Sequence, residues 1–303
     1  MLQPNLKESS LNLLRRYKRA FTHKLKTIVI GTSQAKVKLV VIGAQKGGTT
    51  ALYNYLSLHP QIEAPDNKEL NFFNGVSEQA LHHANYLSLF PKRIGRNEKF
   101  HSIDVSPSYL IDASFVAQRI YQIDKTIKIV AILREPVSRA VSSWFMYKKL
   151  AQKNPDWFIE SGWVKNNKHS RLERRKQFGV SFLDDINEEI DILNQGKRVE
   201  FPIVEYGLYA QQLEHYFNYF GKENVTILFS HELKENTQEC LNTLYRLIGI
   251  APYVLNDEKL IPHFVGDNKV ELPEHELEQL KGFYTAYNDD LSVLLEQPLP
   301  WSS

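Results

Sequence analysis

The sequence predicts a single α/β domain with a central parallel sheet flanked by helices. Residues 39–42 and 127–133 are largely apolar runs typical of buried strands, and residues 224–229 have the pattern of a third strand. A helical pattern follows each of them, and strands that alternate with helices form parallel sheets. No linker or repeat interrupts the chain after its first part, so we expect a basic helical extension at residues 1–35 and one domain at residues 36–303.

Composition and charge exclude several classes of protein. Hydrophobic residues make up 43% of the 303 residues, and the formal net charge is only +2, so nothing points to a nucleic-acid partner. The single cysteine, Cys240, excludes an intrachain disulfide framework and fits a reducing compartment. Because the chain has no run of eighteen apolar residues and no apolar signal core, we expect a cytoplasmic protein without a transmembrane segment.

The extension has the pattern of a basic amphipathic helix. Leu14, Tyr17, Phe21 and Leu25 recur at helical spacing among lysine and arginine side chains. A helix packed on its own domain is the simpler interpretation. Peripheral contact with a membrane surface is the alternative, since basic amphipathic helices also bind there.

A glycine-framed turn after the first strand predicts an anion-binding site. The strand runs into Gly43, the turn ends at Gly48, and a helix begins with Thr49 and Thr50. Glycines let the backbone approach a phosphate, and the helix N-terminus offers N–H groups and the positive end of its dipole. The spacing is nearly that of a nucleoside-triphosphate P-loop, but a threonine takes the position of the lysine, which has moved to Lys46.

The second strand ends in a cationic motif. Arg134 follows the strand directly, and Pro136 suits the first turn of the next helix, where its missing N–H would be unpaired anyway. Arg139 and Ser142 lie three residues apart near the start of that helix. Open α/β sheets bind ligands beyond the carboxyl ends of their strands, so a guanidinium and a hydroxyl here can hold a phosphate.

In combination, the two motifs resemble those of sulfotransferases that use 3′-phosphoadenosine 5′-phosphosulfate (PAPS) as donor. The turn is similar to their 5′-phosphosulfate loop, and Arg-x-Pro-x-x-Arg-x-x-Ser matches their 3′-phosphate motif. The resemblance implies the P-loop-type sulfotransferase fold, 3′-phosphoadenosine 5′-phosphate (PAP) as product, and no metal. It implies that the donor contacts Gln45, Lys46, Gly47, Gly48, Thr49, Thr50, Arg134, Ser142, Arg139 and Tyr209. For Tyr209, the tyrosine of a Gly-x-Tyr that opens a helix, a core position is an equal alternative.

The same resemblance implies a catalytic base. Residues 68–73, Lys-Glu-x-x-Phe-Phe, look like the segment that carries the catalytic glutamate in the heparan-sulfate-type branch of the family. Glu69 would take the proton of the acceptor, and Lys46 would stabilise the phosphate as it leaves. A Lys-Glu pair on its own is usually a surface feature, so this prediction depends on the resemblance.

A third segment, residues 100–110, resembles the Glu-Lys-[Ser/Thr]-Pro-x-Tyr segment of that branch, with two departures. Asp104 stands for the glutamate and Val105 for the lysine. The acceptor-side candidates are Lys68, Phe72, Asp104, Ser106 and Tyr109.

Two other functions are compatible with the motifs. A nucleotide kinase would hold Mg²⁺ between Thr50 and Asp104. Against it stand Thr49 in the lysine position and a second strand that ends in Arg134 instead of an aspartate. The other alternative is a non-catalytic module that binds a phosphonucleotide or an anionic glycan.

We expect the acceptor to be a small molecule or a saccharide that offers a hydroxyl or an amine. The basic, tryptophan-bearing stretch at residues 146–178 would suit a glycan or lipid-linked saccharide. Val105 in place of a lysine favours a small metabolite, and this is our first expectation.

Overall fold

The computed structural model describes most of the domain. Its described residues are 32–34, 36–94, 100–153, 172–173, 178–256 and 272–301. The predicted N-terminal helix and most of the basic stretch at residues 146–178 lie outside them, so the predictions made for these two segments stay predictions.

The centre of the fold is a four-stranded parallel sheet. Its strands are β2 (Lys36–Gly43), β4 (His101–Val105), β5 (Lys128–Leu133) and β8 (Val225–Phe229). They lie in the order β4–β2–β5–β8, and every neighbouring pair is parallel. The predicted α/β fold with a central parallel sheet is therefore confirmed.

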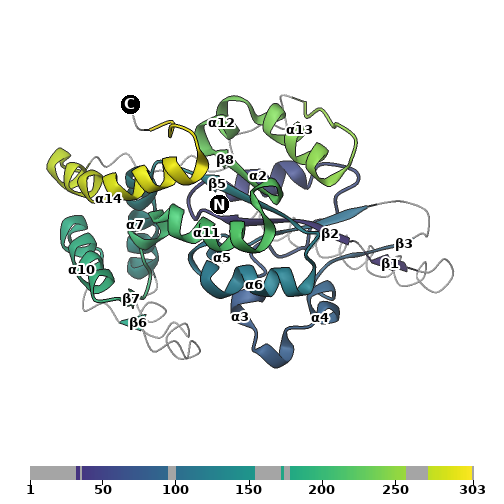
Figure 1. The fold of residues 1–303 in the computed structure, drawn as a ribbon, viewed down its shortest axis with the longest axis horizontal. Helices are drawn as coiled ribbons and strands as arrows, with labels where there is room; N and C mark the ends of the chain where they lie inside the picture. Colours follow the sequence, from purple (N-terminus) through teal and green to yellow (C-terminus); the bar gives the residue numbers. More distant parts are fainter. Residues whose placement is uncertain are drawn as a thin grey trace, which may run out of the picture.

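Helices cover both faces of this sheet. The described helices of the whole domain are α2 (Thr49–Leu56), α3 (Phe72–Gly75), α4 (His83–Leu87), α5 (Ser108–Ile111), α6 (Ala113–Ile123), α7 (Pro136–Lys153), α10 (Phe182–Asn194), α11 (Tyr209–Phe220), α12 (Ser230–Glu235), α13 (Thr237–Ile248) and α14 (Glu274–Leu295). Figure 1 shows α2, α12 and α13 above the sheet and α5, α6 and α11 below it. No described helix is both long enough and apolar enough to cross a membrane.

Short elements complete the described structure. They are the antiparallel pair β1 (Thr32–Gln34) and β3 (Lys92–Ile94), the parallel pair β6 (Leu172–Glu173) and β7 (Arg198–Val199), and the 3₁₀ turns η1 (Glu78–Ala80), η2 (Glu205–Gly207) and η3 (Lys222–Asn224).

The strand β2 is a continuous apolar run from Leu39 to Ile42 because both of its faces are buried there. Val40 and Ile42 pack into the cluster beneath α5, α6 and α11, whereas Leu39 and Val41 pack into the cluster beneath α2 and α13. Successive side chains of a strand point to opposite faces of the sheet. A strand that is covered on both sides is therefore a continuous apolar run, as the sequence showed.

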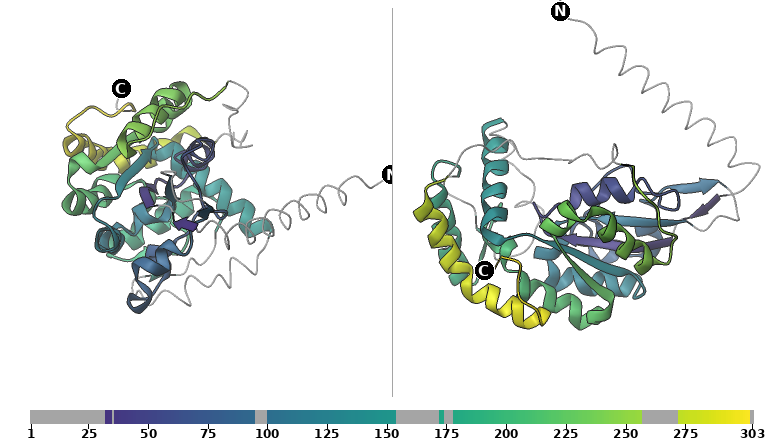
Figure 2. Two further views of the ribbon diagram at one scale, coloured as in Figure 1. Left: turned by 90° about the vertical axis from the view of Figure 1, so that its right-hand side faces the viewer. Right: turned by 90° about the horizontal axis from the view of Figure 1, so that it is seen from above.

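A third apolar cluster lies at one end of the sheet, where α7, α10 and α14 gather (Figure 2). Trp144 of α7 packs edge-on against Phe182 of α10, and its indole N–H donates to Asp185 at 2.6 Å. The buried carboxylate of Glu189 accepts three consecutive backbone N–H groups, those of residues 203–205. This cluster fixes α7, which carries part of the candidate site.

The strand order places the site. β2 lies between β4 and β5, so the chain leaves β2 toward one side of the sheet and later returns on its other side. Doubly wound sheets bind ligands at such a point, in the crevice beyond the carboxyl ends of the strands.

Candidate active site

A cleft of about 1120 Å³ opens beyond the carboxyl ends of the four strands. The segment that follows each strand contributes to its lining: residues 45–48 after β2, Pro107 after β4, Arg134 after β5 and Ser230 after β8. Most of the predicted donor-binding residues line it, namely Gln45, Lys46, Gly47, Gly48, Thr49, Thr50, Arg134 and Ser142.

The loop after β2 needs glycine at two positions. A Cβ at Gly47 would lie 2.4 Å from the carbonyl oxygen of Ile132, so no side chain fits between the loop and β5. Gly48 has a φ of 110°, which L-residues rarely adopt, and it caps α2 without a side-chain hydrogen bond. The first N–H groups of a helix have no partner within it, and residues 48–51 at the start of α2 line the cleft, so this helix start suits an anion.

Two neighbouring elements clamp the loop. The side-chain amide nitrogen of Gln45 donates to the hydroxyl of Tyr147 at 2.8 Å, and the side-chain oxygen of Gln45 accepts from the hydroxyl of Ser143 at 2.8 Å. Both partners belong to α7. From the other side, the Ser230 hydroxyl at the start of α12 donates to the carbonyl of Gly47.

Lys46 and Arg134 bring two positive charges to the same wall of the cleft. The guanidinium of Arg134 donates to the carbonyl oxygen of Lys46 at 3.3 Å. Burial lowers the pKa of both groups, and the Arg134 charge lowers the pKa of Lys46 further. Neither forms an ion pair with another described residue. Although the charge of Glu135 acts on Arg134, neither cation is neutralised by an ion pair with a described carboxylate, and two such half-buried cations are electrostatically suited to an anionic ligand.

The helix α7 turns its two predicted phosphate ligands in different directions. Ser142 faces the cleft. Arg139 is fully buried, donates to the carbonyl of Ile203 and lies over the ring of Tyr206 at 5.8 Å. The structure thus does not bring Arg139 to the cleft, because its side chain belongs to the packing between α7 and η2.

Tyr209 also lies behind the cleft wall. It is buried at the start of α11, and burial raises the pKa of its hydroxyl to about 12. The hydroxyl donates to the carbonyl of Arg134 at 2.8 Å. Tyr209 therefore occupies the core position that the sequence left open and contacts the end of β5 from behind.

The predicted base, Glu69, does line the cleft. Its side chain is 49% exposed, and one carboxylate oxygen is 2.8 Å from the ammonium of Lys68. Glu69 and Asn71 have φ angles of 67° and 48°, in the left-handed region that is unfavourable for residues with a Cβ.

The remaining acceptor-side candidates are not in the lining. Lys68 reaches the cleft only through its ion pair, and the other four are buried behind the wall: Phe72, Asp104, Ser106 and Tyr109. The carboxylate of Asp104 accepts from Ser106 at 2.7 Å, from Tyr109 at 3.0 Å and from Tyr86 at 3.1 Å. Burial raises the pKa of Asp104 to about 6, although these hydroxyls act to lower it. The expected direct contact of these four residues with an acceptor does not match their positions.

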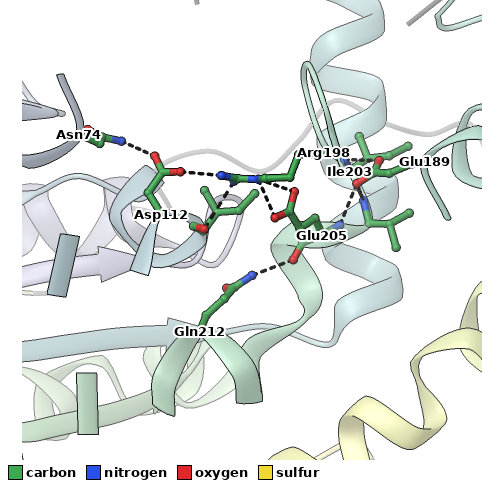
Figure 3. Close-up of polar contacts among 9 residues, drawn as sticks. Asn74, Asp112, Glu189, Arg198, Ile203, Glu205 and Gln212 are labelled. Carbon is green, nitrogen blue, oxygen red and sulfur yellow. Dashed lines mark hydrogen bonds and ion pairs between the residues drawn. The ribbon is translucent and has the colours of Figure 1, made fainter. Parts of the chain in front are cut away.

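Sequence reasoning missed an ion-pair network on the far side of the cleft (Figure 3). Arg198 lies 3.0 Å from the carboxylate of Asp112 and 2.7 Å from that of Glu205, and Asn74 donates to Asp112 at 2.8 Å. Burial raises the pKa of Glu205 to about 7, even with the guanidinium beside it. Asp112 and Arg198 line the cleft. They are 86 residues apart in sequence, and no local motif marks either of them.

The chain has relatives of known activity. It is 24% identical over 242 residues to mouse heparan sulfate glucosamine 3-O-sulfotransferase 5, a match that covers 80% of this chain and 62% of that protein. It is 29% identical over 235 residues to the bifunctional heparan sulfate N-deacetylase/N-sulfotransferase of Drosophila melanogaster, covering 71% of this chain and 20% of that protein. The chain thus spans less than two thirds of either relative.

A solved structure has the same fold. The sulfotransferase from Alicyclobacillus acidocaldarius superposes with a TM-score of 0.62 at 24% identity, covering 88% of this chain and 98% of that chain. The family model described as "Sulfotransferase domain" matches residues 36–279. With most of its length matched by this model, and with the expected sheet and helices in place, the chain belongs to the sulfotransferase domain family.

Proposed function

We propose that this protein transfers a sulfuryl group from PAPS to a hydroxyl or amine of an acceptor. The observation that carries the proposal is the arrangement of one cleft: two cations that form no ion pair with a described carboxylate lie beside a glycine loop and a helix N-terminus, and a carboxylate lines the same space. Membership of the family supports PAPS as the donor.

The donor side has the properties that such a nucleotide requires. PAPS supplies the sulfuryl group and a phosphate leaving group, on which negative charge grows during transfer. Lys46, the hydroxyls of Thr49 and Thr50 and the N–H groups at the start of α2 are placed to stabilise that charge. One such preorganised donor contributes on the order of 3 kcal/mol. Arg134 and Ser142 would hold the 3′-phosphate.

Glu69 would act as the general base. Its half-exposed side chain lines the cleft, and Lys68 contacts only one of its carboxylate oxygens, Oε1. The second oxygen can accept the proton of a hydroxyl or an amine as the new bond forms. Because a carboxylate serves both acceptors, the base does not distinguish O-sulfation from N-sulfation.

For the acceptor we propose a small hydroxyl- or amine-bearing molecule, with a saccharide as the alternative. Val105 is buried on β4, so this position brings no cation to the acceptor side, and a highly anionic acceptor loses that source of attraction. The saccharide alternative is supported by the relatives, whose names include heparan sulfate and glucosamine.

The kinase alternative loses its proposed metal ligand. Asp104 is buried, its carboxylate is occupied by three hydroxyl groups, and it does not line the cleft.

A thermal-unfolding titration tests the donor site. Wild type is titrated with PAP and, separately, with ATP plus Mg²⁺. PAP at about a hundred times its dissociation constant should stabilise the protein by about 2.7 kcal/mol without metal. Arg134→Ala should lose this shift, whereas Arg246→Ala, an exposed arginine on α13, should keep it. A shift with ATP and Mg²⁺ alone would overturn the proposal in favour of a kinase.

Turnover tests the two catalytic roles. With an acceptor found by screening small hydroxyl- and amine-bearing compounds and glucosamine-containing saccharides, Lys46→Ala should lower kcat by about 10²- to 10³-fold. Glu69→Gln should also lower kcat by at least about 10²-fold while PAP still binds. Lys125→Ala, at an exposed lysine in the turn before β5, serves as the control. Turnover within a few-fold of wild type in either active-site variant would contradict its assigned role.

A further inference from the structure

The segment that carries Glu69 is fastened to buried groups behind the cleft. We call residues 69–73 the base strap. Its backbone N–H groups donate in turn to the carbonyl of Val105 at 3.2 Å, to the hydroxyl of Ser106 at 3.1 Å and to the hydroxyl of Tyr109 at 2.9 and 3.4 Å. The strap is therefore attached to the end of β4 and to the start of α5.

The strap has an unfavourable backbone conformation, so these attachments are needed to hold it. Glu69 and Asn71 both have left-handed φ angles. Residues with a Cβ persist in this region only where the surrounding structure over-determines them. The side chain of Asn71 adds one more tie, since its oxygen accepts from Ser108 at 2.7 Å.

The carboxylate of Asp104 determines which way the hydroxyls point. An ionised carboxylate only accepts hydrogen bonds, whereas a hydroxyl has one proton to donate and two lone pairs. The Ser106 and Tyr109 hydroxyls both donate their hydrogen bonds to the Asp104 carboxylate. Their lone pairs are then directed to the N–H groups of the strap. The orientation of the two hydroxyls that accept hydrogen bonds from the strap thus depends on one carboxylate, which can only accept hydrogen bonds.

We propose that Asp104 is a positioning residue for Glu69. It does not line the cleft, and it acts through Ser106 and Tyr109, which hold the strap in the conformation that points the Glu69 carboxylate into the cleft. This proposal rests on the role of Glu69 as base.

The test compares Asp104→Asn with a matched control, Tyr86→Phe. Tyr86 donates to the same carboxylate, and its hydroxyl makes no hydrogen bond to the strap backbone among the described residues. Phenylalanine keeps the ring that packs against Phe72 and Phe73. Tyr86→Phe therefore removes one buried hydrogen bond of Asp104, whereas Asp104→Asn replaces an accepting oxygen by a donor and disturbs the hydroxyls that hold the strap.

Turnover should separate the two variants. A misplaced base lowers the rate of the chemical step, and a displacement of about 1 Å can reduce that rate by about 10²-fold. Asp104→Asn should lower kcat by at least about tenfold, with the KM for acceptor within about threefold of wild type and PAP binding unchanged. Tyr86→Phe should keep kcat within about twofold. An equal fall of kcat in both variants, or no fall in Asp104→Asn, would show that Asp104 has only a structural role and would overturn the proposal.

Hydrogen exchange provides a readout that needs no acceptor. The amides of residues 71–73 should exchange roughly tenfold faster in Asp104→Asn, the equivalent of one weakened hydrogen bond, and at the wild-type rate in Tyr86→Phe. Unchanged exchange in Asp104→Asn would overturn the proposal. If Asp104→Asn does not fold, Tyr109→Phe removes the hydroxyl that accepts from Phe72 and Phe73, and the same increase in exchange is expected there.

The outcomes separate this inference from the proposed function. If the wild type neither binds PAP nor turns over with PAPS, the proposed function fails, and the exchange experiment still reports on the strap. If the wild type is active and Glu69→Gln is inactive, but Asp104→Asn is fully active, only the positioning role fails.

Discussion

Burial shifts the pKa of single residues around the cleft in opposite directions according to their charge. It lowers the pKa of the cations Lys46 and Arg134 at the front of the wall, and it raises the pKa of the acid Asp104 behind it. In each case the low-dielectric surroundings disfavour the charged form. An arriving anion relieves the two cations, whereas Asp104 keeps its environment whether or not a ligand is bound.

The raised pKa of Asp104 predicts how stability depends on pH. Between its ordinary value of 3.8 and about 6, the folded protein binds a proton that the unfolded chain has released. Wild type should therefore lose stability relative to Asp104→Asn as the pH rises from about 4 to about 6, and the difference should then stay constant. The shift of about two units corresponds to roughly 3 kcal/mol. Urea unfolding of both proteins across this range measures it, and parallel stability curves would contradict the assignment.

The sequence predicted those site residues that lie just after a strand or near the start of the helix that follows it. Lys46, Arg134 and Ser142 reached the cleft as expected, because each belongs to a motif near a strand end or at the start of the following helix, whereas Glu69 was predicted from the resemblance alone. Helical spacing alone did not reveal that Arg139 turns into the core. That direction depends on the packing of α7 against η2, which is a tertiary contact.

At the scale of elements, the sequence predicted those helix ends that are determined by a single local residue. α7 begins at Pro136, and α13 ends at Gly249, whose φ of 74° is the left-handed conformation that glycine adopts as a helix C-cap. The two-residue pair of β6 and β7 had no such signal. It is defined by partners on another segment, so only the folded chain reveals it.

The loop after β2 gives a sharp prediction for two glycines. Alanine at Gly47 would place its Cβ 2.4 Å from the Ile132 carbonyl and 2.9 Å from that of Ala44, both backbone atoms that cannot turn aside. Gly47→Ala should lower the free energy of unfolding by about 1–3 kcal/mol and abolish the PAP-induced melting shift. Gly282→Ala is the control, because it lies inside α14 with no atom within 4 Å of the added Cβ.

The control variant should behave in the opposite way. Alanine in a helix interior is more favourable than glycine by about 1 kcal/mol, so Gly282→Ala should melt at a higher temperature and still respond to PAP. Thermal unfolding with and without PAP measures both variants. A Gly47→Ala protein that is as stable as wild type would mean that the loop is less closely packed than described.

At the scale of the whole molecule, Arg198 connects two parts of the fold. Its partner Asp112 lies where α5 meets α6, beneath the sheet, and its partner Glu205 lies in η2 beside the α7, α10 and α14 cluster. The cleft lies along this connection, since Asp112 and Arg198 both line it. Asp112 is 86 residues from Arg198 in the sequence, which explains why no sequence motif could predict the contact.

Removing this connection should destabilise the whole domain. Arg198→Met leaves the largely buried carboxylates of Asp112 and Glu205 without their cation. Breaking a buried ion pair in this way lowers the free energy of unfolding by about 3 kcal/mol. The loss should be at or below this value here, because the Arg198 side chain is 31% exposed. Arg246→Met, at an exposed ion pair on α13, should change stability by less than about 1 kcal/mol. Urea unfolding compares the two variants. Adding Asp112→Asn to Arg198→Met should recover part of the loss, and full additivity of the two losses would argue against a direct interaction.

The hydrogen bonds of Gln45 bear on how the proposed donor nucleotide would bind. Through Ser143 and Tyr147 they join the loop to α7, the helix that also carries Ser142, while Ser230 holds the loop from the side of α12. The two halves of the donor site thus belong to one preorganised framework. Because the loop is already held in place, little conformational entropy should be lost when a ligand binds. Most of the favourable interaction energy with a doubly phosphorylated nucleotide would then contribute to the binding free energy.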